Sequence, residues 1–259
     1  MGKTLLIQSQ LLCFSIIIFF VVACQDKNEI PQSVVGKVKS VTTISDGVSW
    51  SYFYEYDKTG RLIKIANMAE NPDSYETFSI NGNKLVVSNY SNNMLYSTDS
   101  SFLNTRGYVD STRTISSNKY LRIKRFSFKY DNNGFLTNMI EDWGGSSDTS
   151  TYYHDVFEIN GENVVKLYHP SGFIIKYEYF DNYLNNGIYQ IQTREMGGIL
   201  LFPGYYGRYS RNLLKYKIFI NSISADTLKY DYVFSHGRVQ KEIIKQGSST
   251  YQESEFTYY

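Results

Sequence analysis

From Val34 onward, short runs of alternating apolar and polar residues fill the chain. In FIIKYEYF, residues 173–180, the aromatic and aliphatic side chains at the odd positions share one face, and charged side chains lie on the other. In RLIKIAN, residues 61–67, the same alternation places Leu62 and Ile65 on opposite faces. A period of two is typical of β-strands, and no stretch shows the period of an amphipathic helix. The pattern therefore predicts an all-β protein.

Turn-forming residues separate these runs at a regular interval. A glycine preceded by another turn-forming or polar residue recurs about every 25 residues, with one double interval, at Gly60, Gly82, Gly107, Gly134, Gly161, Gly187 and Gly237. A second series of turn residues, such as Asn92-Asn93, lies between them, so the chain reverses about every 12 to 13 residues. Where Asn precedes the glycine, the pair suits a hairpin turn because both residues tolerate positive φ. The spacing predicts one domain, residues 34–259, built as an antiparallel up-and-down meander of about 16 strands, curled into an open or closed barrel-like sheet.

One stretch that contains such a turn recurs along the chain. YDKTGRL, residues 56–62, returns as YDNNGFL, residues 130–136, and more faintly within YDYVFSHGRVQKEI, residues 230–243. We interpret the recurring stretch as the hairpin on one edge of the sheet, seen again as the structural repeat comes round.

The first 23 residues form a separate unit. The apolar run Leu11–Val22 has 12 residues, which suits a secretory signal but is shorter than the roughly 20 that a membrane-spanning helix needs. It ends in VVAC, residues 21–24, which resembles a bacterial lipobox, and this resemblance implies that Cys24 takes a diacylglycerol and becomes the new N-terminus. We therefore expect residues 1–23 to be a lipoprotein signal peptide and residues 24–33 to be the lipidated tether. The alternative is an ordinary signal peptide with a chance cysteine.

The tether and the cysteine count bear on location. Asp26 and Glu29 resemble the acidic export signals that send some lipoproteins of the Bacteroidota to the cell surface; a solvated linker is the alternative. We expect an outer-membrane protein, anchored by lipid, at the cell surface or on the periplasmic face. Cys13 leaves with the signal peptide and Cys24 carries lipid, so the processed chain has no disulfide and no thiolate metal site.

The repeat and the lipobox together resemble a known group of proteins. YDKTGRL matches the YD-repeat pattern Y-D-x-x-G-R-L in full, and YDNNGFL lacks only the arginine, replaced by Phe135. With the lipobox, the chain resembles uncharacterised Bacteroidales lipoproteins that have YD-like hairpins and a porin-like sheet. This resemblance implies the fold and the lipid anchor, and it carries no established activity.

Charge and aromatic content narrow the function. Without Lys3 the chain has 25 basic and 25 acidic residues, a balance that does not favour nucleic acid as a partner. The 25 Tyr and 16 Phe residues suit the wide interior of a curled sheet. KEIIK, residues 241–245, and LRIKR, residues 121–125, put charge on both strand faces, which argues against a membrane-spanning barrel, the alternative.

Catalytic signals are weak. His154 and Asp155 are neighbours in a strand-like run and point to opposite faces, while His169 and His236 lie in turns. No catalytic, phosphate-binding or metal-binding motif is present, so we expect no cofactor and no enzyme activity.

Two stretches hold candidate ligand-binding residues. Trp143 lies among acidic residues in EDWGGSSDTS, residues 141–150, which suits a cation or a sugar hydroxyl; a solvated loop is the alternative. GGILLFPGYYGRYSRN, residues 197–212, breaks the cadence, and its aromatic residues form a candidate platform for a sugar or peptide: Phe202, Tyr205, Tyr206 and Tyr209. The alternative for this stretch is an irregular edge strand whose aromatic side chains pack on the sheet.

These observations predict a monomeric, lipid-anchored envelope lipoprotein that acts in non-catalytic binding or in structure, with a glycan or an envelope protein as ligand. Two alternatives stay open: a surface glycan-processing enzyme, which needs paired carboxylates in a cleft, and a carrier of an apolar ligand inside the curled sheet.

Overall fold

The computed structural model describes residues 37–67, 73–116, 124–143, 151–185, 205–208, 210–221 and 224–259. These residues form 16 strands: β1 (Val38–Ser45), β2 (Val48–Tyr56), β3 (Leu62–Asn67), β4 (Ser74–Asn81), β5 (Lys84–Ser91), β6 (Met94–Leu103), β7 (Val109–Ser116), β8 (Lys124–Tyr130), β9 (Leu136–Trp143), β10 (Thr151–Asn160), β11 (Asn163–Tyr168), β12 (Ile174–Leu184), β13 (Asn212–Ile220), β14 (Ala225–Ser235), β15 (Arg238–Gln246) and β16 (Ser249–Tyr258).

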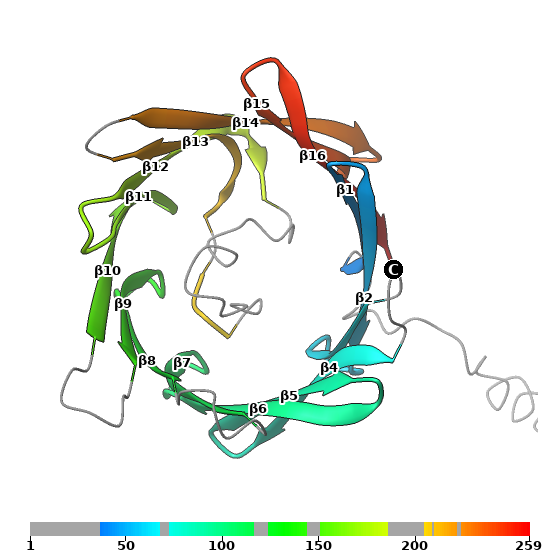
Figure 1. Ribbon diagram of the computed structural model, residues 1–259, viewed down its shortest axis with the longest axis vertical. Helices are drawn as coiled ribbons and strands as arrows, with labels where there is room; N and C mark the ends of the chain where they lie inside the picture. The colour runs from blue at the N-terminus through cyan, green and yellow to red at the C-terminus, as the bar shows by residue number, and fades with distance from the viewer. Residues whose placement is uncertain are drawn as a thin grey trace, which may run out of the picture.

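The strands close into a single barrel (Figure 1). Each strand pairs antiparallel with its neighbours in sequence, and β1 pairs with β16, where Val41 lies opposite Phe256. The predicted 16-strand antiparallel meander is therefore confirmed, and the sheet is closed rather than open. No helix among the described residues is long and apolar enough to cross a membrane.

The barrel has two ends, which we name by the chain. At the terminal end β1 begins and β16 ends, and the Tyr259 amide donates to the Lys37 carbonyl at 3.1 Å. The short turns at this end are residues 57–61, 82–83, 104–108, 131–135, 161–162 and 236–237. At the far end the short turns are residues 46–47, 92–93, 169–173 and 247–248.

Four of these turns share one five-residue form, which explains the recurring sequence. In each, the first amide donates to the fifth carbonyl and the amide of the fourth residue, a glycine, donates back to the first carbonyl, as at Asp57–Arg61 (both 2.8 Å). The other three turns are residues 104–108, 131–135 and 169–173. The first side chain accepts from amides within the turn, as when Asp131 Oδ1 accepts from the Phe135 amide at 2.8 Å. An Asp, Asn or His at the first position and a Gly at the fourth are thus the residues that this turn selects.

The three copies of the repeat form hairpins on one edge of the sheet, as predicted, because their turns at residues 57–61, 131–135 and 236–237 all lie at the terminal end. The third turn has a different form, since Tyr230 lies inside β14 and the turn is the two-residue loop His236-Gly237. Asn before Gly does not adopt positive φ in the described turns, where positive φ outside glycine occurs at Asp46, Asn92, Asn93 and His236. Asn81, for example, stays paired in β4, and Gly82 alone takes positive φ.

One contact identifies which face of the sheet points into the barrel. Residues 205–208 lie inside the ring of strands (Figure 1), and the Tyr206 ring meets the Phe128 ring at 5.0 Å. Phe128 therefore points into the barrel, and its exposed neighbours Ser127 and Lys129 point outward because successive side chains alternate. Because residues paired across two strands point to the same face, the strand register identifies the inward-facing residues of the other strands as well.

The buried core lies on the inward face. In β12, Ile175 and Tyr177 are buried while Lys176 and Glu178 are exposed, so the predicted faces of this strand are confirmed. In β3 the prediction is wrong, because Leu62 and Ile65 both pack on the core. A β-bulge at Ile63, which has no partner between the pairs Glu55–Lys64 and Tyr56–Leu62, turns Leu62 inward.

Candidate functional site in the barrel lumen

A short segment crosses the inside of the barrel before β13 begins. We call residues 205–208 together with 210–211 the inner strap. The Val109 amide donates to the Tyr205 carbonyl at 2.6 Å, and the Arg208 amide donates to the Gly134 carbonyl at 2.8 Å. The strap is therefore bonded to the β6–β7 and β8–β9 turns, on the terminal end of the barrel.

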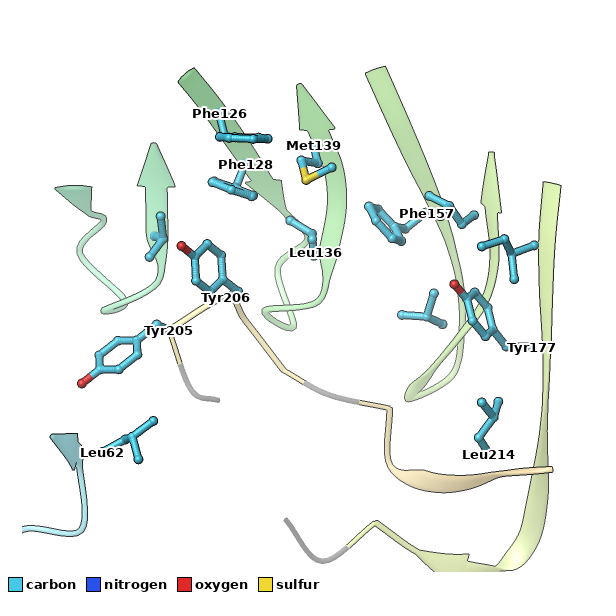
Figure 2. Packing of buried hydrophobic residues seen from close by; sticks show 14 of the residues in the cluster. Leu62, Phe126, Phe128, Leu136, Met139, Phe157, Tyr177, Tyr205, Tyr206 and Leu214 are labelled. Carbon is cyan, nitrogen blue, oxygen red and sulfur yellow. The ribbon is translucent and has the colours of Figure 1, made fainter. Parts of the chain in front are cut away.

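Aromatic packing holds the same part of the strap. Figure 2 shows Tyr206 beside Phe128, with Leu136 and Met139 close by on the neighbouring strand. The Tyr206 hydroxyl lies 3.4 Å from Thr112 Oγ1, and burial raises the pKa of this phenol. A buried phenol with a raised pKa stays protonated and acts as a structural hydrogen-bond group.

Glycine makes this close approach possible. Gly207 has φ +88°, and a Cβ at this position would lie 2.6 Å from the Gly134 carbonyl oxygen and 2.8 Å from the Tyr130 ring. Both the backbone conformation and the contact therefore select glycine.

The second half of the strap is bonded to the β10–β11 turn. Ser210 Oγ accepts from the Val164 amide at 3.0 Å and lies 2.8 Å from the Tyr179 hydroxyl. The Arg211 amide donates to the Glu162 carbonyl at 2.9 Å, and the two side chains form an ion pair at 2.5 Å. The strap is thus fixed at both ends to the inner wall.

These contacts locate the aromatic residues that the sequence singled out. Tyr205 and Tyr206 are 8% and 7% exposed, so the structure places them in the packing arrangement that was the alternative interpretation of this stretch. Phe202 and Tyr209 lie outside the described residues, as does Cys24. Trp143 is the last residue of β9, paired with Thr151, and only its backbone is described. The structure therefore brings together only Tyr205 and Tyr206 of the predicted set.

An acidic group that the sequence did not reveal lies on the inner wall across β4, β5 and β6. Glu76 is paired with Ile65 and with Asn89, and Asn89 Nδ2 donates to Ser97 Oγ at 3.0 Å and to Asp99 Oδ2 at 3.3 Å. Burial, and then the charge of Asp99, raise the pKa of the Glu76 carboxyl from 4.5 to about 7. Near neutral pH, Glu76 therefore exchanges a proton in the barrel wall.

A second polar group joins β9, β10 and the β11–β12 turn. Glu141 and Asp155 occupy diagonal positions in the β9–β10 register and are 6% and 4% exposed. The His169 ring stacks on Tyr153 with centroids 5.6 Å apart, and its Nε2 lies 3.9 Å from Asp155 Oδ1. Burial raises the pKa of the Asp155 carboxyl, and the nearby histidines oppose that rise.

The buried charges of the described residues are mostly acidic. Glu141, Asp155 and Glu242 are buried carboxyls, and Lys217 is the buried ammonium. No group of three or more His, Cys, Asp or Glu side chains in this part of the chain is arranged to hold a metal ion. The wall can therefore take up protons, while its buried carboxyls are shielded from a substrate in solution.

The sequence predicted the orientation of His154 but not the contact that His169 makes. His154 is exposed and Asp155 is buried, on opposite faces as the period of two predicts. The approach of His169 to Asp155 left no signal in the sequence, because it depends on the register of two strand pairs and on the turn that aims the imidazole. Glu76 and Asp99 were hidden in the same way among 25 acidic residues.

Comparison with known proteins gives likenesses of fold. No family model and no curated protein matches the sequence. A porin-like protein from Bacteroides uniformis ATCC 8492 superposes with a TM-score of 0.67 at 12% identity, over 87% of this chain and 99% of its own. A porin-like protein from Bacteroides vulgatus ATCC 8482 gives 0.64 at 14% identity, over 86% and 99%. The chain therefore has the fold of these porin-like proteins.

Proposed function

We propose that the protein is a lipid-anchored lipoprotein of the bacterial outer membrane whose barrel stands in water beside the bilayer and binds a ligand without catalysis. The anchor is Cys24, and residues 25–33 are the tether. One observation carries the proposal: the outward face of the barrel carries cross-strand ion pairs, whereas the hydrophobic core lies on the inward face.

Cross-strand ion pairs occur on the outward face at several places around the ring. They are Glu55–Lys64 (3.3 Å), Glu158–Lys166 (2.8 Å), Asp231–Lys245 (2.9 Å) and Lys241–Glu253 (2.5 Å). In water such exposed pairs are tolerated at no cost and contribute little to stability, because solvent screens them. In lipid, by contrast, one Lys or Arg on the outward face near the midplane costs about 2–4 kcal/mol. A wall with this pattern is suited to water.

The apolar residues on the outward face do not form a band around the ring, although Val156, Tyr168, Ile174 and Ile220 are successive neighbours across β10–β13. Phe102 is 52% exposed, but the outward positions beside it along β6 and across β7 are Ser100 and Ser111. A membrane-spanning barrel instead carries a continuous outward apolar band about 25 Å tall. Single exposed apolar residues are normal on a protein in water.

The inner wall supports binding over catalysis. A glycan-processing enzyme needs two carboxyl groups that reach its substrate, and Glu141 and Asp155 are almost fully buried. A carrier of apolar ligands needs open lumen, and the inner strap with Tyr206 occupies part of that space.

The far end offers a surface for the ligand. Met94, Leu95 and Tyr96 are 69%, 53% and 51% exposed in succession at the tip of the β5–β6 hairpin. A run of exposed apolar residues disfavours solubility unless a function retains it. We propose that this tip contacts a glycan or a second envelope protein.

The tip can be tested by substitution. In a screen of purified envelope glycans and envelope proteins against residues 25–259, we expect a bound ligand to be lost when Met94, Leu95 and Tyr96 are all changed to Ser. Tyr251→Ser, which alters another exposed side chain (46%), is the matched control and should bind normally. Equal binding by the triple variant would exclude the tip.

The anchored-barrel proposal has a direct test. Residues 25–259, expressed without signal or lipid, should elute from size-exclusion chromatography as a monodisperse monomer without detergent. The full chain should partition into detergent, and Cys24→Ala should abolish that partition. A barrel that is soluble only in detergent belongs in the membrane, and the proposal would then be wrong.

A further inference from the structure

The two ends of the barrel differ in charge. The described connections at the terminal end contain six basic residues, Lys37, Lys58, Arg61, Arg106, Arg208 and Arg211, and three acidic residues, Asp57, Asp131 and Glu162. The described connections at the far end contain two acidic residues, Asp46 and Asp73, and no basic ones. Among the described connections, the terminal end therefore has an excess of three positive charges, and the far end an excess of two negative charges.

Part of the terminal end has a repeated chemical pattern. On the adjacent strands β15, β16, β1 and β2, three cations lie over tyrosine rings: Lys37 over Tyr56 (5.4 Å), Lys39 over Tyr259 (5.5 Å) and Arg238 over Tyr258 (5.4 Å). We call these six residues the basic–tyrosine rim. Within the described residues, no ion pair involves its three cations, and the nearby Asp57 is paired with Arg61 at 3.1 Å.

Exposed apolar residues adjoin the rim. On β12 and β14, Tyr183 and Phe234 stack with centroids 4.9 Å apart and are 45% and 39% exposed. Leu184 and Val233 beside them are also about half exposed. The terminal end thus combines basic, tyrosine and apolar side chains, which is the combination that favours a membrane–water interface.

We infer that the basic–tyrosine rim docks on anionic lipid headgroups, so that the far end points away from the bilayer. Lys and Arg near a negatively charged membrane are each attracted to it, and the acidic far end would be repelled. The inference rests on the proposed lipid anchor at Cys24, which brings the barrel to the membrane. The tether alone does not orient the barrel, because the 13 steps from Cys24 to Lys37 reach up to about 45 Å.

The test uses vesicles and the unlipidated protein, residues 25–259. We expect it to sediment with vesicles of phosphatidylcholine and phosphatidylglycerol at low salt, not with phosphatidylcholine alone, and to be released at about 0.5 M salt. Neutralising Lys37, Lys39 and Arg238 together with Gln should weaken the partition on the order of a hundredfold, at roughly fivefold for each basic residue.

A matched control separates the rim from net charge. Arg113→Gln, Arg125→Gln and Lys176→Gln together remove the same charge from exposed positions on the barrel side. This triple variant should bind vesicles nearly as the unaltered protein does, and both triple variants should keep the unaltered melting temperature.

Three results would overturn the inference: no sedimentation of the unaltered protein with anionic vesicles, equal binding to neutral vesicles, or equal loss in both triple variants. Each leaves the anchored-barrel proposal standing, because detergent-free chromatography and the Cys24→Ala partition decide that question independently.

Discussion

Glu76 couples the barrel wall to pH. Its carboxyl pKa is raised to about 7 in the folded state by burial and by Asp99, compared with 4.5 as its ordinary value. Between these values the native state binds more protons than the unfolded state, so the free energy of unfolding falls as pH rises. The stabilising effect is complete below about pH 4.5 and is lost as pH passes through about 7.

We therefore expect Glu76→Gln to flatten the dependence of stability on pH in this window. Urea unfolding at pH 5.5 and pH 8 measures it: the variant should lose less stability than the unaltered protein at the higher pH. Glu178→Gln, at an exposed position on the outward face, is the control and should keep the original slope. An unchanged slope in the Glu76 variant would mean that this carboxyl is already ionised in the fold.

Gly207 and Gly107 separate two reasons for glycine. Their φ angles are +88° and +80°, but only at Gly207 would a Cβ meet other atoms. Gly107→Ala should cost about 1 kcal/mol for the left-handed backbone alone, whereas Gly207→Ala should cost roughly 3 kcal/mol because the strap must also move. Denaturant midpoints measure both. Equal costs would show that the strap yields easily.

At the scale of elements, the five-residue turn is specified by its own residues. Asp131 Oδ1 accepts from the Phe135 amide, and Asn104 makes the equivalent bonds in its turn, to the amides of Arg106 and Tyr108. Asp131→Ala should therefore cost about 1 kcal/mol of stability, while Asp131→Asn should cost much less. Thermal unfolding of the two variants checks this. If Asn were as damaging as Ala, the carboxylate charge rather than the hydrogen bond would matter.

Local signals determined how far the elements could be predicted. A turn residue and a glycine act within a few residues, so the spacing of Gly60, Gly107 and Gly134 located real turns. The face of Leu62 was missed because a β-bulge depends on two strands at once. The hairpin at His236-Gly237 was located correctly, but its two-residue turn form was not predicted, because Tyr230-Asp231 lies here inside a regular strand.

At the scale of the molecule, closure is what protects the sheet edges. Removing residues 249–259 deletes β16 and leaves β1 and β15 each with one unpaired edge, and unpaired strand edges promote aggregation. We expect this truncated protein to be insoluble or aggregated, as judged by size-exclusion chromatography and light scattering. Removing the tether, residues 25–33, should leave a soluble barrel. A soluble monomer without β16 would show that closure is dispensable.

The sequence predicted the barrel but not the segments and side-chain groups inside it. Alternation and turn spacing are properties of single strands and hairpins, and they add up to a 16-strand sheet. The inner strap needed contacts between residues far apart in sequence, such as Tyr205 with Val109 and Ser210 with Val164. The acidic groups on the inner wall depend in the same way on register between strands. Phe202, Tyr209 and Trp143 stay predictions.

The pairing of β1 with β16 also makes the order of synthesis matter. Val41 meets Phe256, so one edge of the first strand stays unpaired until the last strand exists, although its other edge pairs with β2. Contacts between residues so far apart in sequence form slowly, and the edge of β1 stays open in the meantime. The time between making the first and the last strand is therefore when this barrel is most vulnerable to proteases and to other chains.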